Sequence, residues 1–207
     1  MLDADTNELI AGVDEAGRGP WAGPVVVAAA ILSAESSTAL QRAGVNDSKA
    51  LSKAARERCF EIIREEEGLG NLWLSIERAE VPEIDEHNIL RATLRAMTRA
   101  VTNLPIAPAR ALIDGNQLPD LPCPGETVVR GDSKILAIAA ASIAAKVTRD
   151  RLMAALARDH PGYGWERNAG YGTAEHRSAL ESLGVTIHHR RSFAPIRKLL
   201  DDTPTSR

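Results

Sequence analysis

Residues 9–20 read LIAGVDEAGRGP. The stretch opens with a short apolar run, 9–13, which is typical of a β-strand. Two adjacent carboxylates, Asp14 and Glu15, end the run, and a glycine-arginine-glycine turn follows at once. A second apolar run covers 21–32, and the connection between the two runs is too short for a helical crossover. We therefore expect an antiparallel pair of strands with a carboxylate pair beside its bend.

The rest of the chain alternates strand-like and helix-like segments. We expect strands over 72–76, 111–113 and 127–129, and helices over 53–67, 84–101, 135–157, 173–183 and 188–200, the last broken at Pro195. Ser52 is a suitable N-cap for the first helix, and segments 33–45 and 161–173 are interpreted as turns and loops. This order predicts an α/β or α+β sheet with helices on both faces.

Length and composition indicate one cytosolic domain. The chain has 207 residues, of which 44% are hydrophobic, enough for a core. Its two cysteines, Cys59 and Cys123, lie far apart and are expected to be plain thiols. We expect no membrane-spanning segment and no signal peptide. The predicted core covers about 9–157, with a C-terminal helical part over about 158–200 and a frayed tail over 201–207.

Charge is distributed unevenly along the sequence. Residues 1–129 carry 12 Lys/Arg and 20 Asp/Glu, a net charge of −8, whereas residues 130–200 carry 12 and 6, a net charge of +6. An acidic cluster facing a basic rim would produce this asymmetry, and such a rim would attract a phosphate backbone. Chance drift of charge along the chain is the alternative interpretation.

Four acidic residues share one sequence context. Asp14 with Glu15, Asp114 and Asp132 each lie at or just after the end of a short apolar run, close to glycine. Strand ends can meet at one edge of a sheet, and converging carboxylates are typical ligands of hard cations such as Mg²⁺ or Mn²⁺. Asp14 and Glu15 would point to opposite faces of an ideal strand, so we expect a backbone bend there. Solvated turn residues are the alternative for each acid.

Several further residues are candidates for holding a ligand. Gly17, Arg18 and Gly19 offer a backbone that a ligand can approach closely, together with one cation. Tyr171 lies between two glycines, so its ring could stack on a sugar or base, or simply pack. The candidate phosphate-binding cations are Lys49, Lys134, Lys146 and Arg149, with solvated positions as the alternative.

Two other features are less specific. Asn88 is either a binding amide or a surface amide near a helix start. The run from His188 to Arg191 is a basic cluster for which phosphate contact and plain surface both remain open, since it lacks a third ligand at zinc spacing.

These motifs together resemble the ribonuclease HII family. The resemblance rests on ordered motifs between residue 10 and about 198: 14–20 (DEAGRGP), 47–49 (DSK), 114–115 (DG), 131–132 (GD), 138–143 (IAAASI), 145–150 (AKVTRD), 170–173 (GYGT) with His176, and 189–195 (HRRSFAP). It implies a ribonuclease H-like fold: a five-stranded mixed sheet with one antiparallel strand, flanked by helices, and a C-terminal helical part.

The resemblance also implies an activity and residue roles. A family member cuts the RNA of RNA–DNA hybrids and cuts 5′ to single ribonucleotides in duplex DNA, an activity of ribonucleotide excision repair and DNA replication. Its four acids would bind two Mg²⁺ or Mn²⁺ ions. The glycine-arginine-glycine backbone would read the 2′-hydroxyl, and Tyr171 would stack on the following sugar. Lys49, Asn88 and Lys146 would contact substrate, and the enzyme would act as a monomer in the cytoplasm.

Some positions depart from the family pattern, and other functions remain open. Ala169 occupies a position that usually holds lysine, and Ile135 and Ala137 replace small polar residues, so a substrate contact is expected to be missing. The related type III enzymes carry an extra N-terminal domain, for which the residues before Asp14 leave no room. A nuclease for branched or integrating DNA and a non-catalytic hybrid-binding protein are the alternatives.

Overall fold

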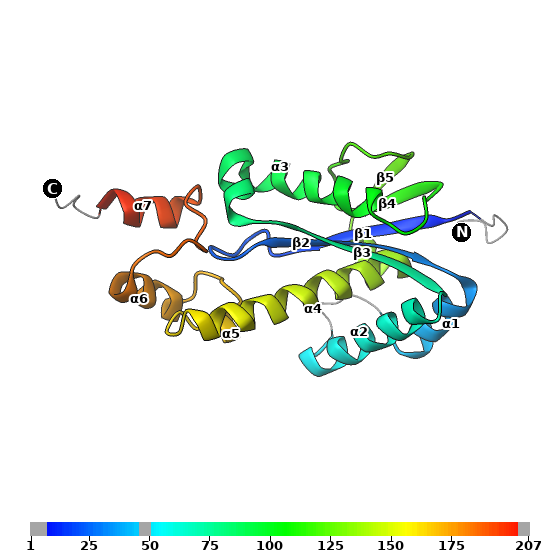
Figure 1. Cartoon of the computed structure of the whole chain (residues 1–207), viewed down its shortest axis with the longest axis horizontal. Coiled ribbons are helices and arrows are strands. Elements are labelled where there is room, and N and C mark those ends of the chain that lie inside the picture. The colour runs from blue at the N-terminus through cyan, green and yellow to red at the C-terminus, as the bar shows by residue number, and fades with distance from the viewer. Residues whose placement is uncertain (1–7, 46–50, 203–207) are drawn as a thin grey trace.

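The computed structural model describes residues 8–45 and 51–202, the last without its side chain. A five-stranded sheet in the order β3-β2-β1-β4-β5 forms its centre (Figure 1). The strands are β1 (Ile10–Ala16), β2 (Val25–Leu32), β3 (Leu72–Ala79), β4 (Arg110–Asp114) and β5 (Gly125–Val128). Because β2 is antiparallel to both neighbours and the β1–β4 and β4–β5 pairs are parallel, β2 alone runs against the other four. This confirms the expected five-stranded mixed sheet.

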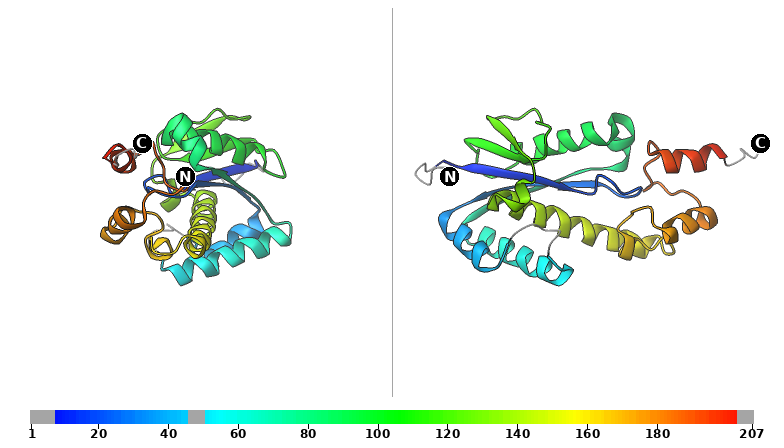
Figure 2. Two further views of the ribbon diagram at one scale, coloured as in Figure 1. Left: turned by 60° about the vertical axis from the view of Figure 1, so that its left-hand side comes forward. Right: turned by 180° about the vertical axis from the view of Figure 1, so that it is seen from behind.

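Helices cover both faces of the sheet. Their bounds are α1 (Ala34–Arg42), α2 (Lys53–Gly68), α3 (Val81–Thr102), α4 (Leu136–Asp159), α5 (Trp165–Asn168), α6 (Ala174–Leu183) and α7 (Ala194–Asp202), with the short 3₁₀ turn η1 at Gly131–Ser133. Figures 1 and 2 show α3 on one face and α4, α2 and α1 on the other, while α5, α6 and α7 gather at the end opposite the N-terminus.

The alternation of β2 explains the two-layer core. Val26, Ala28 and Ala30 pack with α4 on one face, and Val25 and Val27 belong to the cluster that includes α3 on the other. The long alanine-rich helix α4 approaches β1 closely, because a Cβ at Gly12 would lie 2.3 Å from backbone atoms of α4. A third cluster unites the C-terminal helices around Trp165.

Local differences from the expected elements have physical causes. The segment expected to be turn-like forms α1, whose N-terminus is capped by Ser33, since its Oγ accepts from the N–H of Ser36 at 3.2 Å. Helix α3 contains a break at Asn88, where φ is +66°. Strand β2 begins at Val25 instead of residue 21, and only 194–202 of the last predicted helix is helical. The cap at Ser52 is confirmed.

The membrane prediction also has a structural counterpart. Among helices of the described ranges, none combines the length and apolarity that a membrane span requires.

Candidate active site

Strand register gathers the acidic residues at one edge of the sheet. In the parallel β1–β4 pair Val13 lies opposite Ile113, so Asp14 and Asp114 follow at the ends of neighbouring strands. Asp114 in turn lies opposite Val128 in the β4–β5 pair, and η1 follows β5 within three residues. Strand ends that share direction meet at the same edge, as the sequence analysis predicted.

A hydrogen bond ties the third acid to the fourth. The backbone N–H of Gly131 donates to Oδ1 of Asp114 at 2.6 Å. Asp132 is the next residue and is buried within η1. Arg130 begins this turn in the left-handed conformation, with φ of +57°. The turn is therefore bent sharply, and Asp132 is held close to the end of β4.

Asp14 is under electrostatic stress. Its side chain is only 4% exposed. Burial raises the pKa of Asp14 well above its usual value, and the neighbouring charges of Glu15 and Asp114 raise it further, whereas hydrogen bonds from Ser142 and from the N–H of Glu15 lower it. A buried carboxylate beside like charges is disfavoured unless a cation neutralises the group. The site therefore has the electrostatics of a cation-binding site.

The bend expected between Asp14 and Glu15 is absent. β1 remains regular through Ala16, and the turn comes at Gly17, where φ is +97°. Glu15 is half-buried, lies 3.4 Å from Nη1 of Arg18, and lines a hollow of about 140 Å³ together with Asp114. Within residues 8–45 and 51–202, no three His, Cys, Asp or Glu side chains yet stand at metal-binding spacing.

A second cavity places the glycine-arginine-glycine turn beside Tyr171. This cavity, of about 330 Å³, is lined by Glu15, Ala16, Gly17, Arg18, Gly19, Ser142, Lys146, Arg149 and Tyr171. A Cβ at Gly19 would lie 3.4 Å from Cε1 of Tyr171, so the ring stands against the turn. Tyr171 is 49% exposed. Gly19 and Tyr171, which are 152 positions apart in the sequence (171 − 19), thus share one cavity with a carboxylate of the acidic edge.

Comparison with known proteins agrees with this geometry. The family model for ribonuclease HII matches residues 11–196. The chain belongs to the ribonuclease HII family. Ribonuclease HII of Ruegeria pomeroyi is 57% identical over 200 residues, which cover 96% of this chain and 82% of that protein. Family membership makes the chain a nuclease of the ribonuclease H type, a hydrolase whose family acts on RNA–DNA hybrids and uses divalent metal ions.

Solved structures share the fold. Ribonuclease H2 from Pyrococcus horikoshii OT3 has a TM-score of 0.80 at 27% identity, covering 93% of this chain and 97% of that one. Bst-RNase HIII in complex with Mn²⁺ has a TM-score of 0.73 at 20% identity, covering 94% and 70%, and shows likeness of fold alone. The predicted ribonuclease H-like fold is confirmed.

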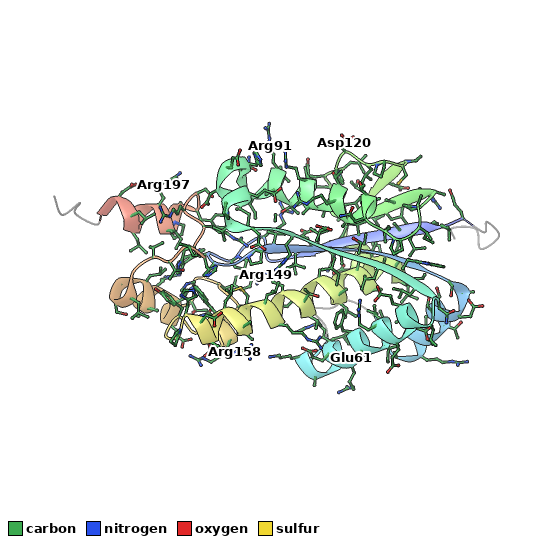
Figure 3. All side chains as sticks on the ribbon, in the orientation of Figure 1. Glu61, Arg91, Asp120, Arg149, Arg158 and Arg197 are labelled. Carbon is green, nitrogen blue, oxygen red and sulfur yellow. The ribbon has the colours of Figure 1, made fainter. Side chains whose placement is uncertain are left out.

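The interpretation of Arg149 as a phosphate-binding cation is wrong. Its side chain is 1% exposed and points into the protein between the sheet and α4 (Figure 3). The guanidinium donates to the carbonyls of Pro24 at 2.9 Å, Ala169 at 2.9 Å and Ala22 at 3.1 Å. Burial lowers the pKa of Arg149 to about 10, so it stays charged at neutral pH.

Within the basic cluster 188–191, Arg191 is exposed, whereas Arg190 fits neither the phosphate contact nor the plain surface considered for this run. Arg190 is fully buried, and its guanidinium donates to the carbonyls of Gly17 at 2.6 Å, Arg18 at 2.9 Å and Gly23 at 2.8 and 2.9 Å. Burial, with a contribution from the charge of Arg149, lowers the pKa of Arg190 to about 9. This arginine fixes the glycine-arginine-glycine turn from behind, a role that local sequence did not indicate.

The other predicted binding residues have diverse surroundings. Lys146 lines the cavity beside the turn, with its Nζ 2.7 Å from Oδ1 of Asp150. Lys134 donates to the carbonyl of Val129. Asn88 is exposed, and its Oδ1 accepts from the N–H groups of Leu90 and Arg91, so it caps the second part of α3. Lys49 falls outside the described residues.

Ion pairs made by two arginines of the C-terminal half neutralise part of the expected basic rim. Arg151 pairs with Glu57 and Glu61, and Arg167 pairs with Glu166 and Glu175. Together with the two buried arginines, these contacts leave fewer of the 12 Lys/Arg side chains of residues 130–200 available for a basic rim.

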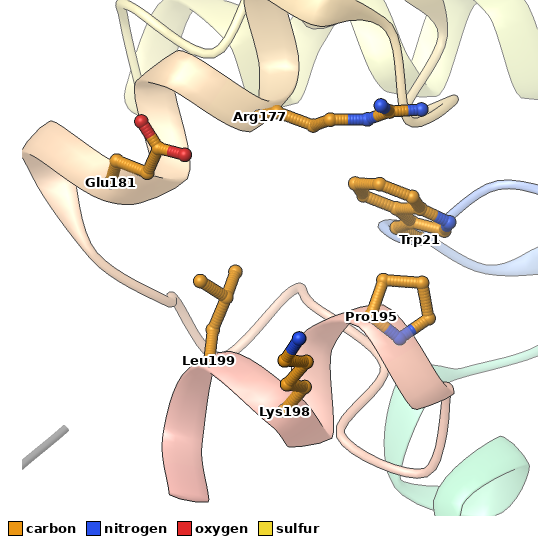
Figure 4. A pocket seen from close by; sticks show the side chains of 6 residues that line it. All are labelled: Trp21, Arg177, Glu181, Pro195, Lys198 and Leu199. Carbon is orange, nitrogen blue, oxygen red and sulfur yellow. The ribbon is translucent and has the colours of Figure 1, made fainter. Parts of the chain in front are cut away.

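A larger hollow lies away from the acidic edge. It has about 580 Å³ and lies between α6 and α7, lined by Trp21, Arg177, Glu181, Pro195, Lys198 and Leu199 (Figure 4). The guanidinium of Arg177 lies over the indole of Trp21 at 5.6 Å. Glu181 is the single carboxylate among the residues that line this hollow.

Proposed function

We propose that this chain hydrolyses the RNA strand of RNA–DNA hybrids and cuts 5′ to single ribonucleotides embedded in duplex DNA. The products would carry 5′-phosphate and 3′-hydroxyl ends. The observation that carries the proposal is the shared cavity of Glu15, the glycine-arginine-glycine turn and Tyr171. The residues that would recognise the sugar and a carboxylate that would take part in hydrolysis line the same cavity, so one substrate could contact both.

The acidic edge fits divalent metal ions. Asp14, Glu15, Asp114 and Asp132 offer only oxygen ligands, which suit Mg²⁺ or Mn²⁺. The pKa of Asp14 is raised by burial and by the charges of Glu15 and Asp114, and a bound cation would offset both effects. Two such ions, when bound, would supply an activated water and stabilise the leaving 3′-oxygen. The four carboxylates would hold the two ions beside the scissile phosphate. Asp14, whose charge interacts with those of both Glu15 and Asp114, would contribute to holding both ions.

The turn and Tyr171 would supply recognition. The 2′-hydroxyl is the group that distinguishes RNA from DNA. The backbone of the turn from Gly17 to Gly19 lines the cavity, where a ribose could approach it, and the exposed ring of Tyr171 beside Gly19 can stack on the next sugar. Lys146 would approach a phosphate from the same cavity. Lys49 and Asn88 are retained as proposed substrate contacts on the resemblance alone.

The cellular setting follows the same proposal. All groups of the site come from one chain, which supports action as a monomer. The substrate is a hybrid or ribonucleotide-containing duplex, so we place the enzyme in the cytoplasm, in ribonucleotide excision repair and DNA replication, with no membrane partner.

Three matched duplexes test the proposal. One contains a single ribonucleotide, one is an RNA–DNA hybrid, and one is all DNA; each is incubated with Mg²⁺, with Mn²⁺ and with chelator, and the cut is mapped to the nucleotide. We expect cutting 5′ to the ribonucleotide and within the hybrid only when metal is present. Cutting of the all-DNA duplex would indicate the branched-DNA alternative. Binding without any metal-dependent cutting would indicate the non-catalytic alternative.

A further inference from the structure

Two buried histidines lie behind Tyr171. His176, on α6, and His189, in the segment before α7, have no exposed surface. Their Nε2 atoms are 3.0 Å apart. Nδ1 of His176 is 3.0 Å from the carbonyl oxygen of Tyr171, and Nδ1 of His189 is 2.9 Å from the backbone N of Thr186. The four groups form a continuous hydrogen-bonded chain that ends at the proposed junction-reading residue.

The two ends of this chain fix the protons between them. The backbone N–H of Thr186 can only donate to Nδ1 of His189. The Thr186 hydroxyl is also 2.9 Å from this nitrogen; its oxygen accepts from the N–H of His188, so its proton can point to the same nitrogen. Nδ1 of His189 therefore accepts and carries no proton. Neutral His189 then has its proton on Nε2 and donates to Nε2 of His176. The indole N–H of Trp165 also donates to this atom, at 3.1 Å, which agrees that it is an acceptor. His176 therefore has its proton on Nδ1 and donates to the carbonyl of Tyr171, which can only accept.

Burial and the neighbouring hydrogen-bond donors favour the neutral forms of His176 and His189. Burial lowers the pKa of His176, and burial together with the neighbouring His176 lowers the pKa of His189 to about 3. A proton added to Nδ1 of His189 would face the N–H of Thr186, and a proton added to Nε2 of His176 would face two donors. The direction of every hydrogen bond from Thr186 to Tyr171 is thus determined at neutral pH.

The backbone that carries Tyr171 is held at three consecutive carbonyls. Arg149 donates to the carbonyl of Ala169, and the N–H of Trp21 donates to that of Gly170 at 2.8 Å. The carbonyl of Tyr171 accepts from the N–H of Thr173 and from His176. The ring itself is half exposed, so its direction depends on this backbone.

We propose that His176 is a positioning residue that, together with His189, orients Tyr171 for recognition of the RNA–DNA junction. His189 and Arg190 are neighbours in the chain: His189 reaches Tyr171 through His176, and Arg190 holds the carbonyls of Gly17 and Arg18. Two consecutive residues thereby hold both elements proposed to recognise the sugars: Tyr171 and the glycine-arginine-glycine turn. This inference rests on the proposed function, in which Tyr171 reads the sugar after the ribonucleotide.

Two isosteric substitutions separate the two ends of His176. His176→Asn places an amide N–H near the position of Nδ1, so it retains a donor to Tyr171 and loses the contact with His189. His176→Gln places its amide near the position of Nε2, so it retains a partner for His189 and loses the donor to Tyr171. His160→Gln is the matched control, because His160 lies in the same aromatic cluster, 5.9 Å from Trp165 between ring centres, outside the chain to Tyr171.

The readout is the ratio of kcat/KM on single-ribonucleotide duplex to kcat/KM on uniform RNA–DNA hybrid. We expect His176→Gln to lower this ratio roughly three- to tenfold, the change that one hydrogen bond corresponds to, while His176→Asn and His160→Gln stay near the wild-type ratio. Equal ratios for the Asn and Gln variants would overturn the positioning role. If the wild-type protein does not cut at single ribonucleotides, the proposed function is contradicted. The role of the two histidines in recognition is then contradicted as well.

A spectroscopic measurement on the wild-type chain covers the case in which a variant does not fold. Ring ¹⁵N spectra of histidine at neutral pH report which nitrogen carries the proton. We expect the Nδ1–H form for His176 and the Nε2–H form for His189. The opposite form at either residue would contradict the chain of hydrogen bonds and overturn the proposal independently of any activity.

Discussion

The acidic edge and the buried basic cluster behind the glycine-arginine-glycine turn treat charge in opposite ways. At the edge, Asp14 is buried beside Glu15 and Asp114, and its pKa is raised by burial first and by repulsion from these two carboxylates second. In the cluster, Arg149 and Arg190 are just as buried, yet their guanidinium groups donate to backbone carbonyls. The difference indicates separate roles. The acidic edge, where like charges lie close together, is suited to binding cations. The buried basic cluster, whose guanidinium groups are hydrogen-bonded, is suited to fixing the backbone of the proposed recognition surface.

Removing the charge of Asp14 from the acidic edge should have the largest effect of the changes considered. Asp14→Asn should lower cleavage by about 10³-fold or more while leaving hybrid binding mostly intact, because the ligand of both proposed ions is lost. The same variant should unfold at a higher temperature in chelator near neutral pH, because the amide removes the repulsion. Cleavage at single turnover, hybrid affinity and thermal unfolding would be measured together.

The control for this prediction is Asp120→Asn, which changes an exposed carboxylate elsewhere in the fold. It should affect neither activity nor stability appreciably. Wild-type turnover by Asp14→Asn would sink the assignment of the acidic edge.

A substitution that keeps the positive charge tests the buried basic cluster. Arg190→Lys should lower the free energy of unfolding by about 3 kcal/mol, since one ammonium group cannot reach the carbonyls of Gly17, Arg18 and Gly23 together. Arg191→Lys, at the adjacent exposed position, should change it by less than about 0.5 kcal/mol. Chemical denaturation of both variants gives the comparison, and equal stabilities would show that charge alone matters at residue 190.

The contact between the two regions can be probed at glycine. Gly17 and Gly115 have φ values of +97° and +105°, but a Cβ at Gly17 would lie 1.9 Å from Nε of Arg149, whereas a Cβ at Gly115 would meet nothing within 4 Å. Gly115→Ala should cost about 1 kcal/mol of unfolding free energy from backbone strain. Gly17→Ala should cost more, about 2 kcal/mol or above, because Arg149 must move. Equal losses of unfolding free energy in the two variants would mean that the Arg149 side chain moves aside at no measurable cost.

Acidification should weaken the histidine chain by a smaller amount. A histidine with a lowered pKa in the folded state binds fewer protons there than in the unfolded chain, so unfolding free energy falls as pH drops from about 6.5 towards about 3. The slope contributed by His189 is at most about 1.4 kcal/mol per pH unit. His189→Gln should flatten the profile by this contribution in urea denaturation at several pH values. An unchanged profile would show that His189 is protonated without cost.

Local pattern was sufficient for the sheet and the acidic edge. Apolar runs that stop at a carboxylate beside glycine mark strand ends wherever they occur, and the alanine-rich run predicts α4 from its own composition. Helix α1 was missed because Ser36 and Ser37 resemble turn residues, although Ser33 caps the helix.

The buried basic cluster could not be predicted in this way. Arg149 reaches Pro24 across 125 positions, and Arg190 reaches Gly17 across 173. Charged residues are rarely fully buried, so their sequence context favoured the surface. Only the packing of α4 and the C-terminal segment against the turn reveals their partners.

The separation of chemistry from recognition is tested most directly by one ratio: kcat/KM on single-ribonucleotide duplex divided by kcat/KM on uniform hybrid, compared between Asp132→Asn and Tyr171→Ala. Asp132→Asn should lower both constants by the same factor and leave the ratio unchanged. Tyr171→Ala should lower the ratio about tenfold, the scale of one aromatic stacking contact. A Tyr171→Ala enzyme with the wild-type ratio, or an Asp132→Asn enzyme with an altered one, would contradict the division between the two regions.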